Sequence, residues 1–174
     1  MFAELAAMGP SSRATARGTS WSGLTVLVPP AERPLHATIA RLPKTAVVAG
    51  WPGFAIDNVP YLARRTAFVT RETHMPFHRG YTELMRERMR ALVLAYFASD
   101  PEPIRSLHRG HGVTHLVVDR RHFDVPPPYF APFDAELRAA FETGKAKGFE
   151  LRRVVERGAG IETGGLLLVD LSRF

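Results

Sequence analysis

The chain has 174 residues, of which 45% are hydrophobic and 23% charged, a balance typical of one globular domain rather than of a disordered chain. It contains no cysteine, which excludes disulfides, thiolate catalysis and cysteine-ligated zinc. The formal net charge of +6 permits anionic partners, but the arginines are spread along the chain among acidic residues, so we do not expect a nucleic-acid-binding face.

The beginning of the chain differs in composition from the rest. Residues 11–22 are rich in Ser, Thr, Arg and Gly, which is typical of a linker or tail. The apolar run at residues 24–28 has the length of a short strand and stops at two prolines. We therefore predict a flexible or weakly ordered N-terminal segment over residues 1–32, followed by one α/β domain over residues 33–174.

Regular patterns begin where this segment ends. Apolar residues at helical spacing predict a short helix over residues 34–41, which Pro43 ends. Compact apolar runs with β-branched residues predict buried strands over residues 45–49 and 66–70. The strongest helical pattern follows at residues 81–99, where apolar residues recur three and four positions apart between charged ones.

The C-terminal half continues this alternation. Residues 103–109 predict a second short helix, residues 113–118 a third buried strand, and residues 135–146 a further helix. Residues 149–155 and 165–171 flank a glycine-rich turn and predict a closing antiparallel pair. Strands that alternate with helices predict an α/β fold: a mostly parallel, Rossmann-like sheet flanked by helices, with an antiparallel C-terminal hairpin at its edge.

Polar, ionisable and aromatic residues gather in the three loops that follow the predicted strands. Ligands bind at this place in parallel sheets, because loops and helix N-termini converge at the carboxyl ends of the strands. The candidate ligand-binding residues are Trp51, Asp57, Glu72, His74, His78, Asp119 and His122. The alternative interpretation is that these polar loops only cap helices and hold the edge of the sheet together.

No motif assigns a catalytic residue, a metal or a cofactor. Walker A and Gly-x-Gly-x-x-Gly loops are absent, and so is the Gly-x-Ser-x-Gly turn of serine hydrolases. The histidines with metal-ligand spacing are His74, His78, His108, His111 and His115. A proline divides the first two and the others fall on different predicted elements, so we expect no metal site. An acid/base pair of Asp57 and Asp119 stays open, because their separation does not follow from the sequence.

Several short phrases of the sequence occur together in a recognisable order. They are residues 42–52 with Gly50, Trp51 and Pro52, then Asp57 and Pro60, Arg64 and Arg65, Pro76 and His78, Tyr81 with the helix that runs into Tyr96, and Gly112 with Asp119. Together they resemble the soluble C-terminal domain of bacterial polytopic membrane proteins related to the GT-C glycosyltransferases, over roughly residues 34–174. In those proteins a bundle of membrane helices precedes an extracytoplasmic α/β domain, and the catalytic carboxylates lie in the membrane portion.

The resemblance implies a non-catalytic accessory or recognition domain on the extracytoplasmic face of a bacterial membrane; without it we expect a cytoplasmic protein. Such a domain would bind an envelope glycan or lipid-linked sugar near Trp51, Asp57 and His78, or pack on a membrane portion that we expect to be missing from this chain. The alternative is a free-standing small-molecule or metal-dependent enzyme. That enzyme would need these strand-end side chains in a single pocket: Glu72, His74, His78, Asp119 and His122.

Overall fold

The computed structural model describes residues 20–21, 24–25, 29–71, 79–129 and 131–174. Most of the predicted N-terminal segment lies outside the described residues, so its division from the domain at residue 33 stays a prediction. Within the described part of that segment, β1 (Ser20–Trp21) pairs antiparallel with β2 (Leu24–Thr25). Pro30–Glu32 forms a short helix, η1, that leads directly into the first helix of the domain.

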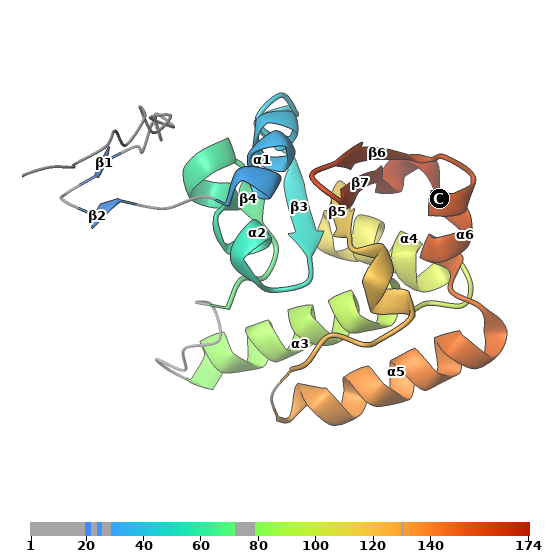
Figure 1. The fold of residues 1–174 in the computed structure, drawn as a ribbon. Coiled ribbons are helices and arrows are strands. Elements are labelled where there is room, and N and C mark those ends of the chain that lie inside the picture. The colour runs from blue at the N-terminus through green and yellow to red at the C-terminus, as the bar shows by residue number, and fades with distance from the viewer. Residues whose placement is uncertain (1–19, 22–23, 26–28, 72–78, 130) are drawn as a thin grey trace, which may run out of the picture.

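The domain is built on one mixed sheet with the strand order β4-β3-β5-β7-β6 (Figure 1). Its strands are β3 (Val47–Gly50), β4 (Thr66–Ala67), β5 (His115–Val118), β6 (Gly160–Thr163) and β7 (Leu166–Asp170). β3 runs parallel to both β4 and β5, whereas β7 runs antiparallel to both β5 and β6. The predicted α/β fold, with a parallel part and an antiparallel C-terminal end, is therefore confirmed.

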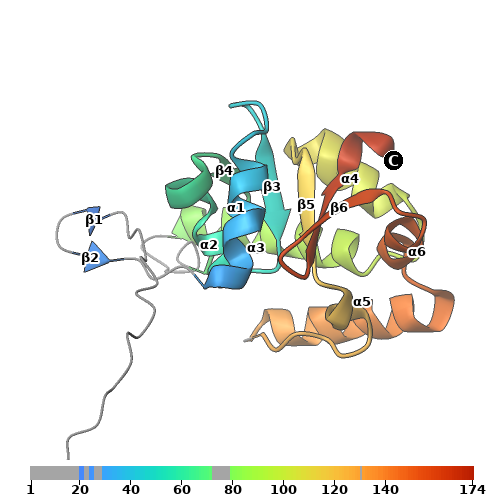
Figure 2. The same cartoon turned by 45° about the horizontal axis from the view of Figure 1, so that its top comes forward.

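Helices cover both faces of this sheet. They are α1 (Arg33–Ile39), α2 (Phe54–Asp57), α3 (Arg79–Tyr96), α4 (Glu102–His111), α5 (Phe133–Lys147) and α6 (Glu150–Glu156), with the short turns η2 (Val59–Ala63), η4 (Arg120–Phe123) and η5 (Leu171–Arg173). Figure 1 shows α3 and α5 running side by side, and Figure 2 shows α1 in front of the sheet. The predicted helices over 34–41, 81–99, 103–109 and 135–146 correspond to α1, α3, α4 and α5.

Two apolar cores explain why both faces of the central strands carry apolar residues. Leu116 and Val118 of β5 join the core formed with α3, α4, α5 and α6, while Val117 between them joins the core formed with α1, α2 and η2. In β3, Ala49 and Val48 divide between the same two cores. Because successive side chains of a strand point to opposite faces, a sheet covered on both sides requires apolar residues throughout.

Two predicted strands differ from the structure. Residues 149–155 form helix α6 rather than a strand, because Leu151 and Val155, four positions apart, are both buried on one face of it. The antiparallel partner of β7 is instead β6, reached through a turn at Gly164 and Gly165. The predicted strand over 66–70 shortens to β4, extended only by a hydrogen bond from the Phe68 N–H to the Val48 carbonyl.

Within the ranges that the structure describes, none of the helices is both long and apolar enough to pass through a bilayer.

Candidate functional site

A cavity of about 640 Å³ opens at the carboxyl ends of β3 and β5. Trp51 enters it from the loop after β3, and Asp119 and His122 from the segment after β5. Tyr96, from the last turn of α3, forms part of its wall, and Glu32 at the end of η1 forms another part. Side chains from four separate segments therefore meet at the edge where parallel sheets bind ligands.

Asp119 is held in place as an ionised carboxylate. Asp119 directly follows β5 and caps η4, because its carboxylate accepts a hydrogen bond from the Arg121 backbone N–H (2.9 Å). The Arg121 guanidinium donates to the same carboxylate at 2.6 and 3.0 Å. The side chain of Asp119 is only 10% exposed, whereas that of Arg121 is 86% exposed. Burial opposes ionisation, but the hydrogen bonds from Arg121 outweigh it, so the pKa of Asp119 lies below its usual value.

His122 and Tyr96 form a second polar contact beside this pair. The Tyr96 hydroxyl accepts a hydrogen bond from the Asp119 N–H (2.9 Å) and lies 3.0 Å from Nδ1 of His122. When the Tyr96 hydroxyl donates to Nδ1, a neutral His122 carries its own proton on Nε2. Nε2 lies 3.8 Å from a carboxylate oxygen of Asp119. Burial raises the pKa of Tyr96, and burial lowers the pKa of His122 although Asp119 opposes that shift.

Trp51 belongs partly to the core and partly to the cavity. Its half-buried ring meets the rings of Tyr96, Phe97, His122 and Tyr129 edge-on, with centroid separations between 5.3 and 6.1 Å. These four contacts fix the orientation of the indole, because edge-to-face packing is the favoured geometry of aromatic pairs. The ring that lines the cavity is therefore rigid.

Asp57 lies at the same edge of the sheet but is not part of the cavity wall. Its carboxylate accepts hydrogen bonds from the backbone N–H of Arg71 (2.9 Å) and from Arg71 Nε (2.7 Å). Burial raises the pKa of Tyr129, whose ring contacts Trp51, and the charge of Asp57 adds to the rise. Asp57 therefore does not share the cavity with Asp119.

The structure brings together three of the seven predicted residues, Trp51, Asp119 and His122. Glu72, His74 and His78 lie outside the described residues. Sequence patterns did not indicate two further residues of the cavity wall, Tyr96 and Glu32. Tyr96 has the apolar spacing of an ordinary core position of α3, and Glu32 precedes the first predicted helix. Arg121 had one signal, since it follows Asp119 by two positions in a loop that holds several charged residues.

A metal centre is not found among the described residues, where no three His, Asp or Glu side chains come together. The predicted histidine trio instead contacts separate protein groups. Nδ1 of His108 lies 2.7 Å from the Val113 carbonyl oxygen, and Nδ1 of His115 lies 2.9 Å from the hydroxyl of Thr114. The ring of His111 packs against another aromatic ring.

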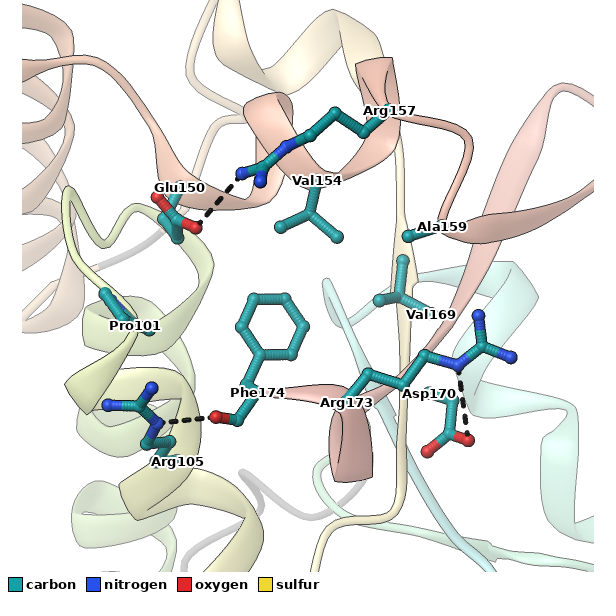
Figure 3. A pocket seen from close by; sticks show the side chains of 10 residues that line it. All are labelled: Pro101, Arg105, Glu150, Val154, Arg157, Ala159, Val169, Asp170, Arg173 and Phe174. Atoms are coloured by element: carbon teal, nitrogen blue, oxygen red, sulfur yellow. Dashed lines mark hydrogen bonds and ion pairs between the residues drawn. The ribbon is translucent and has the colours of Figure 1, made fainter.

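A second pocket of about 300 Å³ lies between α4, α6 and β7 (Figure 3). Its three arginines have protein partners: Arg105 donates to the carbonyl of Phe174 (2.6 Å), Arg157 pairs with Glu150 (3.6 Å), and Arg173 pairs with Asp170 (3.9 Å). Figure 3 shows the ring of Phe174 pointing into the middle of this pocket. The pocket is smaller than the strand-end cavity and partly filled by the chain itself, so we take the strand-end cavity as the candidate site.

Two half-buried histidines, His115 and His122, predict a pH-dependent stability. Burial lowers the pKa of both His122 and His115 below 6.5, so the unfolded chain binds more protons than the folded domain between the folded pKa and 6.5. The free energy of unfolding is therefore expected to fall as the pH decreases from 7 to about 5. The lowered pKa of Asp119 also stabilises the folded domain, and this contribution is lost only at more acidic pH, as the pH falls below 3.8.

Urea unfolding at a series of pH values measures this dependence. The double variant His115→Gln, His122→Gln is expected to flatten the profile between pH 7 and 5, whatever its effect on stability at neutral pH. A wild-type profile that is flat or rises toward pH 5 would contradict the neutral state assigned to these two half-buried imidazoles.

Comparisons of the chain with protein-family models, with curated proteins and with solved structures found no match.

Proposed function

We propose that this chain is a recognition domain that binds a hydroxyl-bearing small molecule, such as a sugar, in the strand-end cavity. The observation that carries the proposal is the rigid Trp51 ring beside a fixed Asp119–Arg121 pair and the neutral His122, all around one cavity. An aromatic ring packs on the apolar face of a sugar, while carboxylate, guanidinium and imidazole groups bind its hydroxyls.

The wider setting that we propose follows from the resemblance to membrane glycosyltransferase-like proteins. In it, the domain has a Rossmann-like sheet and is non-catalytic. It presents an envelope glycan or a lipid-linked sugar, at the extracytoplasmic face, to a membrane portion that carries the chemistry. The genomic neighbourhood tests this setting: coding sequence for a bundle of apolar helices directly upstream would support it. Without such a sequence, the recognition proposal would rest on the cavity alone.

Trp51 provides the means to test binding directly. The chain has two tryptophans, so the substitution Trp21→Phe leaves Trp51 as the single tryptophan and its emission as a report on the cavity. Titration with neutral monosaccharides is expected to change this emission in a saturable way. Asp119→Asn is expected to weaken binding about ten-fold or more, because a hydrogen bond to a charged group is lost.

Asp134→Asn is the matched control for this substitution. Asp134 also pairs with an arginine, Arg138 (3.0 Å), but it lies on the surface of α5 and does not line the cavity. It should leave the dissociation constant unchanged, and both variants should keep the far-ultraviolet circular dichroism of the parent. Equal affinities for the parent and Asp119→Asn, or no saturable change with any sugar, would contradict the proposal.

A second candidate function is suggested by one contact, the 3.8 Å approach of His122 Nε2 to the Asp119 carboxylate. A neutral imidazole next to a carboxylate is an arrangement that enzymes use for general acid/base catalysis. The same titrations discriminate between the two functions. Slow hydrolysis of a bound nitrophenyl glycoside that disappears in His122→Gln would favour the enzyme, and binding without turnover favours recognition.

A further inference from the structure

The wall of the cavity contributed by η1 carries an unusual carboxyl group. Oε2 of Glu32 is buried and has no hydrogen-bond partner among the described residues. Burial raises the pKa of Glu32, and the nearby His36 opposes the rise. Buried polar atoms in folded proteins are nearly always hydrogen-bonded, so this oxygen calls for a donor.

A second buried polar atom without a described partner lies one helical turn further on, in His36. Nε2 of the buried His36 lies 2.9 Å from the carbonyl oxygen of Ala55, and because a carbonyl can only accept, this nitrogen carries the proton. Nδ1 of His36 is also buried without a partner among the described residues. Residues four apart are neighbours on a helix surface, so His36 lies close to Glu32, in agreement with its effect on the pKa of that carboxyl group.

The position of Glu32 is fixed by close packing of the backbone around it. Gly164, in the turn between β6 and β7, has a φ of +61°, and a Cβ at that position would lie 1.8 Å from the carbonyl oxygen of Ala31. Only glycine allows this approach, which holds the end of η1 against the turn. Glu32 therefore belongs to a defined wall of the cavity, together with Gly164 and Gly165.

The charges around the cavity indicate what kind of donor it takes. Two carboxylates, those of Glu32 and Asp119, and one guanidinium line the cavity, and that guanidinium, of Arg121, is already bound to Asp119. His122 adds no positive charge while its imidazole is neutral. An excess of negative charge attracts a cationic amine and opposes a phosphate group.

We propose that Glu32 receives the amino group of the ligand, so that the cavity prefers an amino sugar over a neutral or phosphorylated sugar. This inference rests on the proposed function, because it assigns the chemistry of the ligand at that same cavity. The ligand amine supplies the donor that Oε2 of Glu32 lacks among the described residues. The sugar hydroxyls then face Trp51, Asp119 and His122.

The test compares three probes near neutral pH: glucosamine, glucose and glucose 1-phosphate. With Trp51 as the single tryptophan, glucosamine is expected to bind about ten-fold more tightly than glucose, and glucose 1-phosphate more weakly than glucose. Glu32→Gln should remove the preference for the amine while glucose still binds. Glu142→Gln, which makes the same charge change at an exposed position of α5, should leave the preference unchanged.

Two results would overturn the inference and leave the proposed function standing: glucose binds as tightly as glucosamine to the unsubstituted protein, or glucosamine keeps its advantage in Glu32→Gln. The first comparison needs no substitution at Glu32, so it decides the matter even where that variant does not fold. Binding of none of the three probes would overturn the inference and the proposed function together.

Discussion

Replacing Arg65 by methionine is expected to lower the free energy of unfolding by about 4 kcal/mol. Arg65 is 6% exposed, and its guanidinium donates hydrogen bonds to four backbone carbonyls: those of Ala40, Leu42, Ala63 and Arg64. Methionine fills a similar volume but offers no donor, so these acceptors lose their partners in or near the core. Charge-assisted hydrogen bonds are the stronger kind, which makes their joint loss costly.

The effect is expected to depend on the shape of the guanidinium as well as on its charge. Arg65→Lys keeps the charge, but a single ammonium cannot reach carbonyls from both α1 and η2, so an intermediate loss of about 2 kcal/mol is expected. Arg41→Met, at an exposed position near the end of α1, is the control and should change the free energy of unfolding by less than about 0.5 kcal/mol. Chemical denaturation measures all three, and a loss in Arg65→Met no greater than in the control would contradict the role assigned to Arg65.

Arg65 also bears on the candidate site. It ties the carbonyls that follow α1 to the end of η2, and Glu32 is the residue immediately before α1. Loss of this link would loosen the helix that positions one wall of the cavity. A weaker preference for glucosamine in Arg65→Lys, at a temperature where the variant is still folded, is consistent with that link.

Replacing Gly144 by alanine is expected to destabilise the domain by about 3 kcal/mol, even though alanine favours helices over glycine. Gly144 lies inside α5, where a Cβ would sit 2.4 Å from the backbone carbonyl oxygen of Phe97 and 2.5 Å from the ring of Phe149. A backbone carbonyl cannot rotate away as a side chain can. The substitution must therefore push α5 away from the end of α3 and disturb the larger core.

Gly110→Ala provides the opposite control. Gly110 lies in the last turn of α4, and the nearest atom to a Cβ there is the Ser106 hydroxyl oxygen at 4.0 Å. Without a clash only the helix preference remains, so this substitution is expected to raise the free energy of unfolding by up to about 1 kcal/mol. Thermal or urea unfolding compares the pair, and an equal change in both variants would rule out close packing at Gly144.

The sequence pattern failed where tertiary contacts changed the meaning of a short apolar run. Val154 and Val155 favour a strand by composition, yet α6 forms because Leu151 and Val155 are buried on one face and the Glu150 N–H donates to the Ala98 carbonyl (2.7 Å). Seven residues are too few for periodicity to separate a helix from a strand. The tertiary contacts of this segment decide whether it forms a helix or a strand.

The candidate site was predictable to the extent that it is built from strand ends. Trp51, Asp119 and His122 follow β3 and β5 directly, so parallel-sheet topology was enough to place them together. Tyr96 and Glu32 could not be found in this way. One occupies a core position in the longest helix, and the other sits in a turn whose place depends on the distant β6–β7 connection.

Local periodicity and composition were thus sufficient for the α/β class, the central strands and four of the helices, because those features depend on residues close together in the chain. The position of α6, the partner of β7 and the burial of Arg65 depend on contacts between distant segments. The cavity itself depends on the same kind of contact. Polar strand ends mark one side of the cavity, but the position of Glu32 in its wall depends on the packing of η1 against the glycine turn.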